Sequence, residues 1–190
     1  MSIGNSKAGA NFDGALRSNR PFGGAVLPVG RWTVACYSQG ATEKPKWSET
    51  FDNLITTEGA NELLYGCLFG AGGSTDWYIG LKSTGAAVVA DTAASHASWT
   101  ELTNYADPRV LWAGASSGVS AGSVSNSTSV ASFTMTSSAN IAGAFLQSAS
   151  SQAATTGVLY AAGDFSAEKD VVTNDTLEVT ATFTAVTSSG

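Results

Sequence analysis

The sequence predicts an all-β protein: an antiparallel β-sandwich, jelly-roll or immunoglobulin-like, with one short helix and an extended N-terminal arm. Three observations predict this class. Only 13% of the 190 residues are charged, roughly half of the ~25% usual in soluble proteins. Gly is frequent, and Ser, Thr and Ala fill most of the remaining surface positions. Short apolar segments recur roughly every 8–15 residues between turn-forming stretches. The length suits one domain, divided into an arm of residues 1–28 and a body of residues 29–190.

The arm has few features of a folded segment. It contains five glycines and two prolines, and its apolar side chains are too sparse to build a core. A disordered tail is one interpretation, but a tail selected for solubility needs no phenylalanines. We therefore interpret the segment as an arm that docks on a neighbouring molecule. The predicted partner-binding residues are Phe12, Leu16, Arg17, Arg20 and Phe22.

Strand-like segments begin directly after the arm. RWTVACY places Trp32, Val34 and Cys36 on one face with a period of two, and KPKWSETF repeats the pattern after a turn, which predicts a hairpin. The further predicted strands are, in order, DWYIGLK, SWTELTNY, RVLWAG, SVASFTMTS, NIAGAFLQS, GVLYAAGDF and DTLEVTATFTAV. The last alternates apolar and polar residues throughout, as a strand with one solvated face does.

One segment, TTEGANELLYGCLFGAGG, predicts a helix. Thr57 is the expected cap, Glu58 lies in the first turn, and the glycines from residue 70 end the helix. The helical stripe predicts an apolar face that lies on the core, so we expect the helix to plug the end or side of the β-structure. The stripe consists of Ala60, Leu63, Leu64, Cys67 and Leu68.

Charge is distributed unevenly along the chain. Residues 1–31 contain four basic residues and one acidic residue, whereas residues 32–190 contain five basic and fourteen acidic residues. An acidic body repels phosphates and anionic lipid, so we expect neither nucleic acid nor a membrane as partner. No apolar run approaches the ~18–20 residues of a membrane span, and MSIGNSKAGANF lacks the apolar region of a signal peptide. We therefore expect a location inside a cell, or in whatever is assembled there.

The residue inventory argues against catalysis. The 54 residues from 110 to 163 include no Asp, Glu, Lys, Arg or His, and general acid–base chemistry needs such groups. His96, the single histidine, is expected to have a structural or hydrogen-bonding role. Cys36 and Cys67 are expected to be buried free thiols. Asp164, Glu168, Asp170 and Asp175 are expected to form a solvated loop, with a Ca²⁺ site as the alternative. We predict no enzyme, no cofactor and no metal; a carbohydrate-binding module using exposed Trp faces is an alternative, and a hydrolase is the weakest.

The uncharged segment, residues 110–163, indicates that the protein self-associates. Exposed sheet edges are normally guarded by charges or proline, and residues 110–163 provide no such guards. Either the segment is a neutral surface covered by Ser and Thr, or other subunits cover its edges. We expect self-association, because a closed symmetric oligomer buries such edges, and we favour a trimer.

Several blocks together resemble a group of small virion proteins of tailed bacteriophages. These blocks are GRWTVACY, KWSETFDNLITTEGANELL, DWYIGLKSTG, DTAASHASWTEL, GAFL, LYAAGDFSA and NDTLEVTATF, and they cover residues 30–186. Proteins of this group are named variously as capsid decoration (cement), minor structural or tail fibre proteins. The resemblance implies a virion component, and no catalytic residue carries over from it.

Physical reasoning favours one place in the virion. A decoration protein holds neighbouring shell proteins together, and an arm of 28 residues spans up to ~90 Å when extended. The sequence therefore predicts a non-enzymatic decoration protein on the capsid surface, assembled in the host cytoplasm, whose arm clamps the major capsid protein. The alternative is a short tail fibre head or tail adaptor that binds a host carbohydrate or another tail protein.

Overall fold

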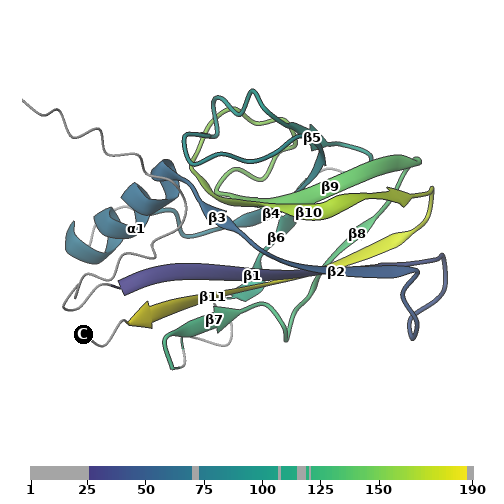
Figure 1. The fold of residues 1–190 in the computed structure, drawn as a ribbon, viewed down its shortest axis with the longest axis horizontal. Coiled ribbons are helices and arrows are strands. Elements are labelled where there is room, and N and C mark those ends of the chain that lie inside the picture. The colour runs from purple at the N-terminus through teal and green to yellow at the C-terminus, as the bar shows by residue number, and fades with distance from the viewer. Residues whose placement is uncertain (1–25, 70–72, 107, 115–118, 120, 188–190) are drawn as a thin grey trace, which may run out of the picture.

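The computed structural model describes residues 26–69, 73–106, 108–114, 119 and 121–187. These residues form two antiparallel β-sheets packed face to face, with one α-helix at one end (Figure 1). The predicted all-β sandwich with one short helix is therefore confirmed. The predicted boundary between arm and body, after residue 28, falls within the first strand, which begins at Val26.

The first sheet contains the first and the last strand of the chain side by side. Its order is β2–β1–β11–β7, and β8 also pairs with β11. Trp32, Val34 and Cys36 are buried, and their partners on β11 are buried as well, which explains the alternation seen in both segments. β2 pairs with β1 as the predicted hairpin. The strands are β1 Val26–Tyr37, β2 Trp47–Asp52, β7 Ser123–Ser125, β8 Ala131–Thr134 and β11 Thr176–Thr187.

The second sheet has the order β3–β10–β9–β4–β5, and β6 also pairs with β4. Its central strand β9 is buried from Ile141 to Gln147 without alternation. The reason is that the segment between β4 and β5 covers the outer face of this sheet and packs Trp99 against Phe145. The strands are β3 Leu54–Ile55, β4 Tyr78–Thr84, β5 Thr100–Leu102, β6 Val110–Leu111, β9 Ala139–Gln147 and β10 Leu159–Val171.

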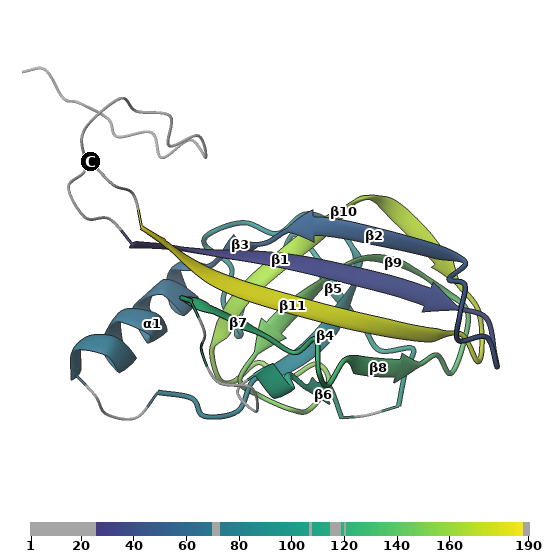
Figure 2. The same cartoon turned by 90° about the horizontal axis from the view of Figure 1, so that it is seen from below.

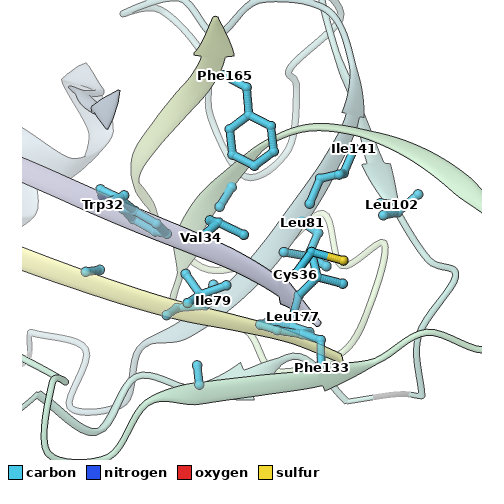
Figure 3. Packing of buried hydrophobic residues seen from close by; sticks show 14 of the residues in the cluster. Trp32, Val34, Cys36, Ile79, Leu81, Leu102, Phe133, Ile141, Phe165 and Leu177 are labelled. Carbon is cyan, nitrogen blue, oxygen red and sulfur yellow. The ribbon is translucent and has the colours of Figure 1, made fainter. Parts of the chain in front are cut away.

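The main core lies between the two sheets. Figure 3 shows Trp32, Val34 and Cys36 of β1 opposite Ile79 and Leu81 of β4. Phe51 links the two layers, because its ring stacks on Trp32 at a centroid distance of 6.2 Å and meets Phe165 edge-on at 5.1 Å. Burial of each large side chain contributes about 1.5–3 kcal/mol, so this core accounts for much of the stability of the sandwich.

The chain passes from one sheet to the other at Asn53. β2 belongs to the first sheet and β3 to the second, and Asn53 is the single residue between them. The Asn53 side chain occupies the space beside Gly30, where an added Cβ would lie 2.0 Å from Asn53 Oδ1. A glycine at position 30 is therefore what allows the strand to change sheets so abruptly.

The helix α1 spans Thr57–Phe69 and joins the sandwich mainly through its first turn. Thr56, not the predicted Thr57, caps it: Thr56 Oγ1 accepts a hydrogen bond of 3.0 Å from the Gly59 amide. Beyond this turn the helix projects from the end of the sandwich (Figures 1 and 2). The predicted stripe does not lie on the core, because Leu63, Leu64, Cys67 and Leu68 are exposed.

The strands differ from the sequence-based prediction in three respects. β1 begins at Val26, which pairs with Thr187, so residues 26–28 of the predicted arm are strand. β3 and β7 were not predicted, because segments of two and three residues are too short to show a period. β10 extends through the acidic segment expected to be a loop, and Asp164 and Asp170 therefore lie on a strand.

Candidate partner-binding site

The partner-binding residues predicted from the sequence are Phe12, Leu16, Arg17, Arg20 and Phe22. All five belong to residues 1–25, which lie outside the described residues. The structure therefore places none of them, and the described body offers a different candidate surface.

The body has an apolar hollow of about 290 Å³ where α1 meets the end of the sandwich. We call it the α1 groove. Its lining comes from the helix, from both sheets and from the segments beside them. The side chains that define it are Leu63, Cys67, Trp77, Trp112, Tyr160 and Phe183.

The floor of the α1 groove is a chain of aromatic rings in fixed positions. Tyr160 meets Trp77 at a centroid distance of 5.3 Å and Phe183 at 5.5 Å, and Trp112 meets Phe183 at 5.4 Å. All three contacts are edge-on, which is a favoured arrangement for such pairs. Trp112 Nε1 also donates a hydrogen bond of 3.1 Å to the Ala181 carbonyl. The groove is therefore formed without further rearrangement.

The outer surface of α1 continues the apolar character of the groove. Leu64 is 57% exposed and Leu68 is 72% exposed, one turn apart on the helix. Leu63 is partly exposed at the border of the groove. Adjacent apolar side chains exposed on this scale are typical of a surface that another chain covers.

The surroundings of the groove are acidic. Glu62 lines it and accepts a hydrogen bond from the Ser74 amide, and Asp76 is exposed nearby in sequence. Residues 57–81 contain Glu58, Glu62 and Asp76 but no Lys or Arg. A partner that presents apolar and basic side chains together therefore complements this surface.

The sequence analysis did not predict this site, because the apolar stripe on α1 was expected to face the core. An apolar helical stripe looks the same whether its own sheet or another chain covers it.

Two ion pairs stabilise the fold: Arg109–Glu101, which is buried, and Lys82–Asp164, in which only the lysine is buried. Arg109 donates two hydrogen bonds to the Glu101 carboxylate, at 2.8 and 2.7 Å, and a third to the Ala149 carbonyl at 2.8 Å. Lys82 contacts Asp164 across the glycine of β9 that pairs with both. Burial lowers the pKa of Lys82 below its usual value, although the contact with Asp164 opposes this.

A third cluster surrounds Asp175, which is buried. Its carboxylate accepts hydrogen bonds from Lys46 Nζ at 2.6 Å and from the Val172 amide at 2.9 Å. Burial acts to raise the pKa of Asp175, but these bonds outweigh it and hold the pKa below its usual value. Burial, together with the neighbouring Asp175 charge, raises the pKa of Cys36 to about 12, so this thiol is unreactive.

The structure also describes the single histidine, the two cysteines and the four acidic residues considered in the sequence analysis. His96 stacks on Trp99 at 3.9 Å, and its Nδ1 lies 3.2 Å from the Trp99 carbonyl oxygen, which is a structural role. Cys36 is a buried free thiol as expected, but Cys67 is exposed, because the side of α1 that carries it is not covered by the sandwich. The four acidic residues do not form the expected solvated loop, since Asp175 is buried beside Lys46.

Among the described residues, neither a cluster of metal ligands nor a membrane-spanning helix is found. No three His, Cys, Asp or Glu side chains in this part of the chain gather to hold a metal ion. None of its helices has the length and apolarity to cross a membrane. Trp32 and Trp99 are buried and Trp47 packs against the core, whereas Trp77 and Trp112 line the α1 groove, so the carbohydrate-binding alternative stays a prediction.

The uncharged segment contributes to both sheets. It supplies the central strand β9, and it also supplies β7 and β8, which flank the outer edge of β11. Phe133 and Ile141 are buried, whereas Val130 is partly exposed just before β8. Both β7 and β8 are short, which limits the edge they offer.

Comparison with known proteins finds no protein-family model that matches the chain and no curated protein with significant similarity to it.

Proposed function

We propose that the protein is a capsid decoration protein of a tailed bacteriophage, which clamps neighbouring major capsid proteins through its arm and stabilises the shell. The observation that carries the proposal is the difference in chemistry between residues 1–25 and the described body. The described body is a β-sandwich whose two described cores lie between Trp32 and Phe183. Residues 1–25 combine sparse apolar side chains with three basic residues and one acidic residue, which suits a segment that docks on a partner.

Charge and sequence resemblance support the same proposal. The arm is basic and the body is acidic, so the arm is suited to an acidic surface elsewhere in the assembly. The blocks that resemble phage virion proteins lie in the body, in segments that form strands, α1 and the connection between β4 and β5.

Deletion of residues 1–25 tests the proposal. We expect the truncated protein to remain folded with a cooperative melting transition, because β1 and both described cores are retained, and to lose binding to capsids that lack the protein. Thermal melting and co-sedimentation with such capsids measure the two effects. Deletion of residues 1–9 is the matched control, since it shortens the arm but keeps all five predicted partner-binding residues. Full-affinity capsid binding by the longer truncation would refute the proposed clamp.

A position in the tail is the alternative placement. Labelling of the protein in intact virions, read by electron microscopy, separates the two, because a decoration protein labels the shell and a fibre head or adaptor labels the tail.

A further inference from the structure

The α1 groove leaves an apolar surface open at one end of the body. α1 is fixed to β10 at its first turn, where the Thr56 amide donates to the Tyr160 carbonyl and the Gly59 backbone lies against Tyr160. Leu64 and Leu68 follow on the projecting part of the helix and are more than half exposed. A cavity of ~150 Å³ accommodates a benzene molecule, so the groove, at about 290 Å³, has room for a phenyl ring.

The described chain begins at the same end of the body as the groove. Figures 1 and 2 both show the start of β1 and the helix α1 at that end. Phe22 precedes Val26 by four residues and Leu16 precedes it by ten. At ~3.3 Å per residue, these side chains reach ~13 and ~33 Å from the start of β1.

The chemistry of the arm complements that of the groove. Within residues 12–22 the chain combines Phe12, Leu16 and Phe22 with Arg17 and Arg20. The groove combines aromatic walls with Glu62 at its border, and residues 57–81 contain no basic side chain. Apolar and electrostatic complementarity therefore point to the same pair of segments.

We propose that residues 12–22 of the arm cover the α1 groove of their own body, with Phe22 or Leu16 in the groove and Arg17 and Arg20 beside Glu62 and Asp76. We favour binding of the arm to the groove of its own chain over binding to the groove of a second copy, because a short tether raises the effective concentration of the arm at the groove to the millimolar range. This inference goes beyond the proposed function and does not depend on it, since it requires no capsid.

Thiol trapping in the full-length protein tests the contact. Cys67 lines the groove and is exposed, whereas Cys36 is buried with a pKa of about 12 and does not react. Asn19→Cys introduces a thiol between the two arginines and keeps every apolar anchor. Under mild oxidation we expect a disulfide between position 19 and Cys67 within one chain, which non-reducing electrophoresis and peptide mass spectrometry identify.

Two controls make the result specific. Asn5→Cys lies on the same arm outside the proposed segment, and we expect it to couple at least several-fold more slowly than the thiol at position 19. Asn19→Cys combined with Phe12→Ser, Leu16→Ser and Phe22→Ser keeps the tether but removes the anchors, and should slow coupling to the rate of the Asn5→Cys control. The melting temperature of each variant confirms that the body is folded.

The possible outcomes separate clearly. Fast coupling within one chain supports the proposal. Disulfide-linked dimers as the main product would overturn it in favour of exchange between copies, and equal rates for positions 5 and 19 would overturn it in favour of random collision. A failure of the capsid-binding test leaves this result unaffected, because no capsid is present.

Discussion

Several buried or partly buried carboxylates in this body accept hydrogen bonds from more than one donor. Glu58 illustrates the pattern: one of its oxygens accepts hydrogen bonds from the Ala93 amide at 2.9 Å and the Leu159 amide at 2.7 Å. Glu101 binds Arg109 through both oxygens and also accepts from the Ala153 amide. Such groups tie loops to strands, and their removal leaves buried donors without partners, which costs more than the bond itself contributes.

Asp175→Asn should lower the free energy of unfolding by about 1–3 kcal/mol near neutral pH. The substitution removes the negative charge that accepts hydrogen bonds from Lys46 Nζ and the Val172 amide. The pKa of Asp175 is lowered in the folded state, so its contribution is complete above the ordinary carboxyl pKa and is lost as the pH falls through the folded value. The variant should therefore also lose stability less steeply on acidification. Urea titrations at pH values from about 6 down to about 3 measure both effects.

Asp52→Asn is the matched control for this variant. Asp52 forms an ion pair of 3.2 Å with Arg31, but both side chains are more than 70% exposed, so its loss should change stability little. If Asp175→Asn behaved like Asp52→Asn, the buried cluster would not contribute as described.

At the scale of elements, the glycines of α1 differ in what surrounds them. A Cβ at Gly59 would lie 2.1 Å from the Tyr160 carbonyl oxygen, whereas a Cβ at Gly66 would meet no atom within 4 Å. Gly59 is therefore the residue that allows the first turn of the helix to approach β10, and Gly66 has no packing role.

Gly59→Ala should destabilise the protein by about 1–3 kcal/mol, because backbone atoms must move to admit the methyl group. Gly66→Ala, on the same helix, should stabilise it by up to about 1 kcal/mol, since alanine is the better helix former. Thermal or urea unfolding of the two variants provides the comparison. Equal effects of the two substitutions would contradict the close approach at Gly59.

The strands and the helix also show which features of the fold can be predicted from the sequence. Strands with one buried face were predicted well, because alternation as in Leu177, Val179 and Ala181 reflects the fold directly. The cap at Thr56 differs from the predicted one by a single residue, whereas the sheet change at Asn53 depends on its close approach to Gly30, a distant residue that local patterns do not reveal. The α1 groove was missed for the same reason, and the predicted arm residues lie outside the described part of the chain.

At the scale of the whole molecule, the two edges of the first sheet differ in charge. β2 carries Glu49 and Asp52, whereas β7 and β8, at the opposite edge, carry no charged residue. An uncharged edge of this kind is open to pairing with another chain, so the expectation of a closed trimer stays a prediction for this edge.

Val130→Lys tests the prediction. Val130 is partly exposed just before β8, so the lysine should leave the melting temperature nearly unchanged but shift the protein from trimer to monomer in analytical ultracentrifugation. Ser48→Lys on the exposed surface of β2 is the control and should not change association. Phe133→Lys and Ile141→Lys are unsuitable, because both side chains are buried and the fold itself would fail. A monomeric wild-type protein that also stands alone on the shell would rule out the trimer.

The pairing of β1 with β11 also has a mechanical consequence. A pull on the arm enters the body at Val26 and runs along β1, which pairs with β11 as far as Tyr37. Tension along the strand axis loads these inter-strand hydrogen bonds in shear, so they resist together and are not peeled apart one at a time. β2 holds the other edge of β1 from Arg31 to Cys36 and shares the force. A body attached by its first strand in this way spreads tension through a whole sheet, which suits a protein that must stay folded while its arm is under strain.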